Sequence, residues 1–98
     1  MSDSLLARLE KWYSQQCDGD WEHSYGVHID TLDNPGWLVV VDLEQTELEG
    51  RSFSYEEDRT DDDWVNASSD GRKFQGAGGP SNLEAVLRVF LEFAEGGH

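Results

Sequence analysis

The sequence predicts an α+β domain with a mainly antiparallel sheet of four or five strands, on which an N-terminal and a C-terminal helix pack. Two observations support this prediction. Apolar residues recur at helical spacing near both ends of the chain, over residues 3–16 and 81–94. Between these segments, short runs of alternating residues are separated by Gly, Pro, Asn and Asp, which is typical of strands joined by hairpins. Each helix then has one apolar stripe to bury against the sheet.

Length and composition indicate a single acidic domain over residues 1–98. The chain has 21 Asp and Glu against 7 Lys and Arg, which gives a formal net charge of −14. This balance argues against binding to nucleic acid or anionic membranes and favours a basic partner, although an acidic surface also serves solubility. With one cysteine, no apolar leader and no long apolar run, we expect a cytoplasmic protein that does not cross a membrane.

The first helix is expected over residues 3–16. Its apolar residues share one face at 3.6 residues per turn: Leu5, Leu6, Leu9, Trp12 and Tyr13. Ser2 or Asp3 can cap its start, and Gly19 supplies the left-handed conformation with which helices often end.

Two strands are expected next, over residues 21–31 and 37–43. In the first, residues alternate between an apolar face that includes Trp21 and a polar face, while the second reads as a central strand. Between them, Asp33–Gly36 predicts a type II turn, with Pro35 in its second position and Gly36 at positive φ in its third.

Three shorter strands are expected in the second half of the chain: around Phe53 and Tyr55, over residues 64–67, and over residues 72–75. The run Glu56–Asp63 holds six carboxylates, so repulsion and hydration favour a loop or a loosely held strand end. Asp70–Gly71 is a strong hairpin signal.

The C-terminal helix has the clearest signals. Ser81–Glu84 has the pattern of a capping box, and an apolar stripe follows it: Leu83, Val86, Leu87, Phe90, Leu91 and Ala94. The preceding segment, residues 76–80, lacks the lysine and spacing of a phosphate-binding loop, so it is interpreted as a tight corner between strand and helix that Pro80 stiffens.

Cys17, His23 and His28 are the candidates for chemistry, either as a metal site or as a cysteine nucleophile with a histidine base. Their spacing is poor for zinc, because His23 and His28 fall on opposite faces of the predicted strand. Nearby carboxylates disfavour a thiolate at Cys17. We therefore expect no catalytic, metal or cofactor site, and keep a small enzyme or ligand-binding domain in the Cys17–His28 region as the alternative.

The four tryptophans are divided by their neighbours. Trp12 and Trp37 are expected in the core. Trp21 and Trp64 directly adjoin carboxylates, which suits an aromatic anchor within an acidic protein interface, although both could equally be core residues beside solvated turns.

The same residues resemble the immunity protein 53 family of bacterial polymorphic-toxin systems. The similarity lies in Trp12–Tyr13, Gln16–His23, Gly26, Thr31–Trp37, Asp63–Trp64, Gly76–Pro80 and Asn82–Leu83. It implies a cytoplasmic inhibitor, not an enzyme, that binds and neutralises a cognate toxin.

The resemblance brings no assigned functional residues, so the partner-binding surface is our inference from charge and aromatic content. It comprises Asp18, Asp20, Trp21, Glu22, Glu56, Glu57, Asp58, Asp61, Asp62, Asp63 and Trp64. The expected partner is a toxin with a basic surface. If the toxin is a nuclease, the acidic side chains could occupy its basic substrate groove in place of phosphates. The sequence leaves open the toxin's identity and the oligomeric state of the protein.

Overall fold

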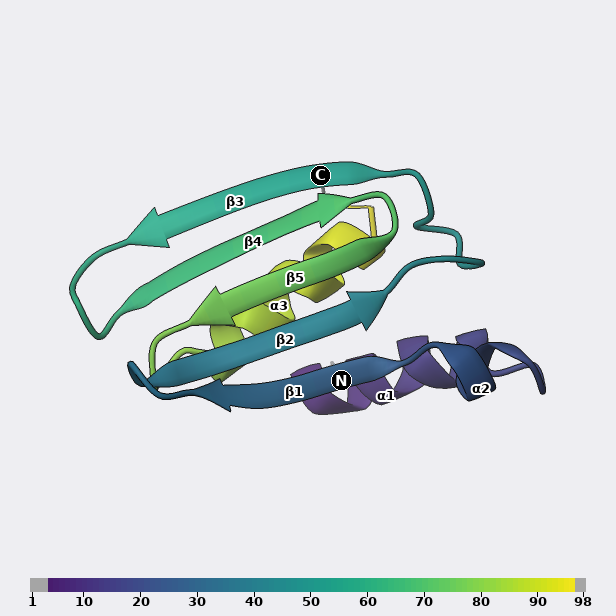
Figure 1. Cartoon of the computed structure of the whole chain (residues 1–98), viewed down its shortest axis with the longest axis horizontal. Helices are drawn as coiled ribbons and strands as arrows, with labels where there is room; N and C mark the ends of the chain where they lie inside the picture. Colours follow the sequence, from purple (N-terminus) through teal and green to yellow (C-terminus); the bar gives the residue numbers. More distant parts are fainter. Residues whose placement is uncertain (1–3, 97–98) are drawn as a thin grey trace.

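The structure is a computed structural model that describes residues 4–96 (Figure 1). In chain order its elements are α1 (Leu5–Gln16), α2 (Trp21–Ser24), β1 (Val27–Leu32), β2 (Gly36–Asp42), β3 (Ser52–Asp58), β4 (Trp64–Asp70), β5 (Lys73–Gly78) and α3 (Leu83–Ala94). The prediction of an α+β fold with an N-terminal and a C-terminal helix is confirmed, and the sheet has five strands.

The strands lie in the order β1-β2-β5-β4-β3, and every neighbouring pair is antiparallel. β5 is the last strand in the chain and the central strand of the sheet. It pairs with β2 on one side and β4 on the other, so it joins the β1–β2 hairpin to the β3–β4 hairpin. β1 and β3 are therefore the two edges of the sheet.

The core lies between one face of the sheet and α3, with α1 packed beside α3 (Figure 1). Phe74 of β5 is fully buried and meets Phe90 of α3 edge to face, with ring centroids 5.0 Å apart. Glycine lets α3 approach closely, because a Cβ on Gly76 would lie only 2.7 Å from Val86 Cγ1. No helix of residues 4–96 covers the opposite face of the sheet, which is in the foreground of Figure 1.

Of the two tryptophans expected in the core, one is buried and the other is not. Trp12 is buried, as expected, and packs edge to face on Phe90 with centroids 5.1 Å apart. Trp37 is only half-buried, and its indole N–H donates a hydrogen bond to the Pro80 carbonyl (2.9 Å). For Trp21 the sequence leaves open an interface anchor or a core residue, and in the structure it is a core residue with 2% of its surface exposed.

α1 begins at Leu5, two residues later than predicted. Ser4 is its N-cap, and the Ser4 hydroxyl oxygen accepts a hydrogen bond from the Ala7 N–H (3.1 Å). The predicted caps, Ser2 and Asp3, lie outside the described residues.

The strand predicted over residues 21–31 is wrong in its first half, where Trp21–Ser24 forms the short helix α2. Asp18 Oδ1 accepts hydrogen bonds from the backbone N–H groups of Asp20 and Trp21, both at 3.0 Å. These bonds turn the chain into the helix, and four alternating residues fit one helical turn as well as they fit a strand.

The predicted type II turn is also wrong. Gly36 lies within β2 opposite Leu32 and does not have positive φ, which a type II turn requires at that position. The Asn34–Pro35 peptide bond is cis, and residues 33–35 connect the two strands. Glycine is needed at position 36 because a Cβ there would collide with the Gly78 carbonyl oxygen of β5.

The last three strands are longer than predicted. β3 extends through Asp58, so the acidic run is part strand and part loop. β4 continues past Ala67 to Asp70, and the predicted hairpin follows, with Gly71 at φ 89°. β5 includes Gly76–Gly78, where the sequence predicts a corner. The glycines at 76 and 78 serve close packing instead, because a Cβ at either would crowd Val86 of α3.

α3 is the predicted C-terminal helix, but the capping box does not form. Asn82, not Ser81, is the N-cap, and its side chain makes no capping hydrogen bond. Asn82 Oδ1 accepts a hydrogen bond from the Trp64 N–H (3.4 Å), and Asn82 Nδ2 donates to Asp63 Oδ1 (3.0 Å). The side chain therefore ties the start of α3 to the segment that enters β4.

Candidate functional site

The structure places the predicted contact residues in two groups at opposite ends of the sheet (Figure 1). Residues 18–22, here named the α2 end, lie where the chain enters β1. Residues 56–64, here named the loop end, lie where β3 ends and β4 begins. The strand register separates them, because β1 starts opposite the last part of β2, whereas β4 starts beside the end of β5. They do not form one surface.

At the α2 end, the carboxylates bond to the backbone of their own segment. Glu22 accepts hydrogen bonds from the N–H groups of Asp18 (3.0 Å) and Gly19 (3.0 and 3.2 Å). Backbone hydrogen bonds from Trp21 and then Asp20 hold the pKa of Asp18 below its ordinary value. The side chains of Asp18 and Glu22 thus stabilise the turn into α2. The third predicted carboxylate here, Asp20, is exposed and makes no capping hydrogen bond with its side chain.

Trp21 is enclosed by this turn. Its indole N–H donates to the Glu44 carbonyl (2.9 Å), and its ring meets the rings of Trp12 and Tyr13 edge to face at 6.2 and 6.0 Å. A partner could reach Trp21 only by disrupting the core, so the α2 end does not supply the predicted aromatic anchor.

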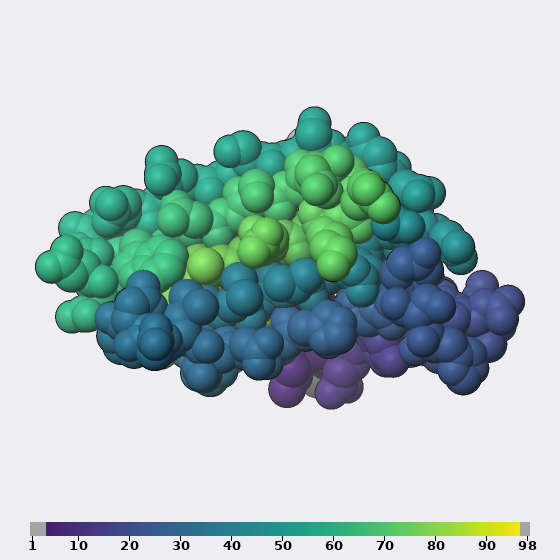
Figure 2. Space-filling model, viewed as in Figure 1, coloured from purple at the N-terminus to yellow at the C-terminus, as the bar shows by residue number. Residues whose placement is uncertain are grey.

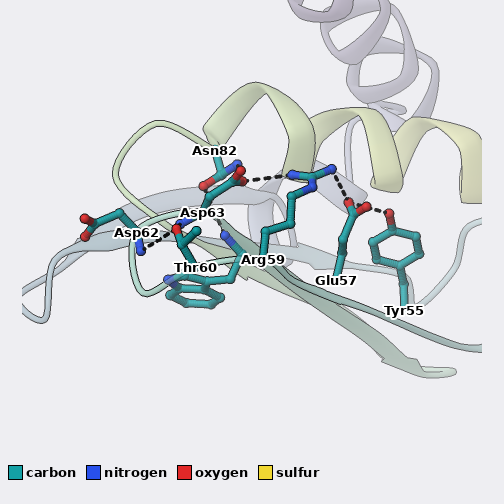
Figure 3. A network of polar contacts seen from close by, with 8 residues as sticks. Tyr55, Glu57, Arg59, Thr60, Asp62, Asp63 and Asn82 are labelled. Carbon is teal, nitrogen blue, oxygen red and sulfur yellow. Dashed lines mark hydrogen bonds and ion pairs between the residues drawn. The ribbon is translucent and has the colours of Figure 1, made fainter.

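At the loop end, Arg59 organises part of the acidic run (Figure 3). Its guanidinium forms ion pairs with Glu57 (2.8 Å) and Asp63 (2.9 Å). The Tyr55 hydroxyl donates to the same Glu57 oxygen (3.1 Å), and Asn82 holds Asp63 from the side of α3. The charges of Asp63 and Glu57 raise the pKa of Arg59, and burial followed by the hydrogen bond to Glu57 raises the pKa of Tyr55.

The loop itself is fixed by backbone contacts. Thr60 Oγ1 accepts hydrogen bonds from the N–H groups of Asp62 (3.2 Å) and Asp63 (3.0 Å), and the Asp63 carbonyl accepts from the N–H groups of Arg59 and Thr60. Behind the loop, Gly79 packs so closely that a Cβ there would collide with the Asp62 carbonyl oxygen. These contacts define the backbone conformation of the loop end.

Carboxylates without partners project from this fixed loop. Asp58, Asp61 and Asp62 are exposed, and no side-chain hydrogen bond or ion pair holds them in the described part of the chain. Glu56 is exposed on the same strand face as Asp58, and Trp64, directly opposite Asp58, is half-buried. In Figure 2 this region forms the teal-green end at the left of the molecule. Together they present concentrated negative charge beside an aromatic ring.

The alternative region has a different arrangement. Cys17 is exposed at the end of α1, His23 lies in α2 and His28 in β1. Within residues 4–96, no three His, Cys, Asp or Glu side chains are grouped so that they could hold a metal ion. In the same residues, no helix has the length and apolar character needed to cross a bilayer.

Sequence reasoning missed three residues that shape the loop end: Arg59 and Thr60 within it, and Asn82 at the start of α3. Thr60 could have been recognised, because a threonine two residues before Asp62 suits a side-chain turn. Arg59 stood among six carboxylates as the single cation of its run. Asn82 gave no usable signal, since its partners are 18 and 19 residues away in the chain.

The geometry defines a class of protein, a small α+β domain with an acidic loop at one end of its antiparallel sheet. A family model described as Immunity protein 53 matches residues 6–95 of the 98-residue chain. The chain belongs to this family, which confirms the resemblance and makes it an immunity protein of toxin systems. Comparison with curated proteins and comparison with solved structures gave no match.

Proposed function

We propose that this protein binds and neutralises a cognate polymorphic toxin in the cytoplasm, and that the loop end is the surface that contacts the toxin. Family membership supports the inhibitory role. The single observation that carries the choice of surface is the set of exposed, unpartnered carboxylates on a loop fixed by Thr60 and Arg59. In this proposal the protein inhibits the toxin by binding it, and no residue of the chain is given a catalytic role.

The charge of the loop end suits a toxin whose active site binds a polyanion, as in a nuclease. Asp58, Asp61 and Asp62 can occupy positions that phosphates of the substrate would take, and Trp64 adds apolar contact area beside them. A net charge of −14 also steers a basic partner toward the complex before contact. Because the loop is already ordered, little conformational entropy is lost when it binds.

The first test is recovery of the toxin. The tagged protein is used to capture partners from its own strain under toxin-expressing conditions, at low and at high salt. Capture of one toxin polypeptide that falls as salt rises supports both the role and the acidic contact. Capture that does not depend on salt would support the inhibitory role but exclude the loop end as the main contact. Failure to capture a toxin would overturn the proposed function.

The second test locates the surface with purified toxin. The triple variant Asp58→Asn/Asp61→Asn/Asp62→Asn should slow association about tenfold at low salt, with a smaller difference at high salt. A matched control, Glu10→Gln/Asp20→Asn/Glu49→Gln, makes the same charge change at exposed carboxylates elsewhere. If the two variants slow association equally, net charge and not the loop end is responsible, and the proposed surface is wrong.

A further inference from the structure

The outer edge of β1 has no strand partner in the described part of the chain. β1 pairs with β2 on one side, and no other segment of residues 4–96 pairs with its other side. Residues 28–31 are all exposed, including Ile29 at 41%. The other edge strand, β3, carries three successive acidic residues, Glu56–Asp58, which discourage strand pairing. β1 has no proline, lysine or bulge that would protect it.

The backbone groups on this edge can be assigned from the register. The Gly26 carbonyl accepts a hydrogen bond from the Asp42 N–H (3.1 Å), so Gly26 directs its backbone groups toward β2. In an antiparallel pair this direction alternates, so His28 and Asp30 also face β2. Val27, Ile29 and Thr31 therefore direct their N–H and C=O groups outward, where a further strand could bond to them.

We propose that β1 pairs with β1 of a second copy of this chain, antiparallel and centred on Ile29. In this register Ile29 lies opposite Ile29 of the second copy, and Val27 lies opposite Thr31. Both are outward-facing positions, so each pair can exchange two backbone hydrogen bonds across the new interface. The result is a two-fold symmetric dimer with a continuous sheet, in which the same surface is used on both copies.

The side chains of β1 complement each other in this register. His28 lies opposite Asp30 of the second copy on the uncovered sheet face, and symmetry repeats this pair, so an imidazole meets a carboxylate twice. On the helix-covered face, Ile29 meets Ile29 of the second copy. An antiparallel copy of β1 centred on Ile29 therefore offers complementary side chains to β1 itself. This complementarity favours a second copy of the chain as the partner.

An apolar groove beside β1 adds to this surface. It has a volume of about 300 Å³ and is lined by Leu9, Glu10, Tyr13, Gly26 and Val27, between α1 and the start of β1. Tyr13 is 38% exposed, and Ile29 follows Val27 by two residues on the same face of β1. Pairing through β1 places Thr31 of the second copy opposite Val27 and covers apolar surface here.

The dimer leaves the loop end free. The loop end connects β3 to β4, and β3 is the edge of the sheet opposite β1. Each copy carries a net charge of −14, so raising the salt concentration should strengthen dimerisation. The proposed toxin contact has the opposite salt dependence. Failure of one proposal is therefore distinguishable from failure of the other.

A charge exchange in β1 tests the register by sedimentation of the full chain over a range of concentrations. The wild type should shift toward twice the chain mass of 11.1 kDa as concentration rises. His28→Asp sets a carboxylate opposite Asp30 of the second copy and should weaken the dimer about tenfold. His28→Asp combined with Asp30→His restores both pairs and should restore dimerisation. A wild type of single-chain mass throughout, or no rescue by the double variant, would overturn the proposal.

Cross-linking gives a second test that does not depend on the stability of a charge variant. In a Cys17→Ser background, Ile29→Cys places the two thiols opposite each other, and a short bifunctional thiol reagent should link the copies. Thr31→Cys is the matched control, because its two thiols would be four residues apart along the strand, about 13 Å. Equal cross-linking of both variants would contradict pairing centred on Ile29.

Discussion

At the α2 end, the carboxylates of Asp18 and Glu22 accept hydrogen bonds from their own backbone, whereas at the loop end Asp58, Asp61 and Asp62 have no side-chain partner in the described chain. The tryptophans beside them differ in the same way, since Trp21 is buried and Trp64 is half-exposed. The two ends therefore combine similar residues for different purposes. One end completes the fold, and the other presents charge.

The largest expected effect is the difference in stability lost when each of the two tryptophans is replaced. Trp21→Ala should lower the free energy of unfolding by about 3–5 kcal/mol, because it removes a side chain that is 2% exposed and packed against other rings. Trp64→Ala should cost less than half as much while weakening toxin binding. Urea unfolding measures the first effect, and equal losses in the two variants would show that Trp64 is also a core residue.

A smaller effect concerns the charge of Asp18. Its folded-state pKa is lowered, so its ionised form stabilises the fold above the ordinary carboxyl pKa of about 3.9, and this stabilisation is lost as pH falls through the lowered folded-state pKa. Asp18→Asn should lower the thermal midpoint at pH 7, and the difference from wild type should shrink in acid. Asp61→Asn is the control and should leave the midpoint at pH 7 unchanged, because within residues 4–96 no hydrogen bond holds that exposed carboxylate.

The smallest expected effect concerns the order of the loop end. Arg59→Gln releases Glu57 and Asp63 from their ion pairs, which are solvent-exposed, so the unfolding midpoint should hardly change. The looser loop should dissociate from the toxin about twofold faster. Arg88→Gln makes the same charge change at the Glu84 pair on α3. If both variants dissociate alike, the Arg59 network does not preorganise the binding surface.

Sequence reasoning found the elements whose signals repeat. The 3.6-residue period identified α1 and α3, and alternation with turn residues identified the strands and the Asp70–Gly71 hairpin. It failed at α2, where four residues are too few to distinguish a helical turn from a strand, and where hydrogen bonds to Asp18 decide the outcome. It failed at Asn82 because contacts distant in the chain outweighed local capping.

The candidate site was harder to predict than the fold. All eleven residues predicted for the partner surface were chosen by charge or by an aromatic ring beside charge, and these properties do not reveal which strands become neighbours. The position of β5 between β2 and β4 sets the two groups at opposite ends, and the packing of α1 over Trp21 removes that ring from the surface. Both facts belong to the tertiary structure.

The central place of β5 also determines when this protein can start to act. The two hairpins of the sheet have no pairing with each other until residues 73–78 lie between them, and α3, which covers the core, follows β5 in the chain. Translation therefore delivers the organising strand late. We expect nascent chains that end before residue 73 to be degraded rapidly by protease and to give no protection. A cell that makes toxin and inhibitor together would depend on finishing each inhibitor chain, since a partial copy would be inert.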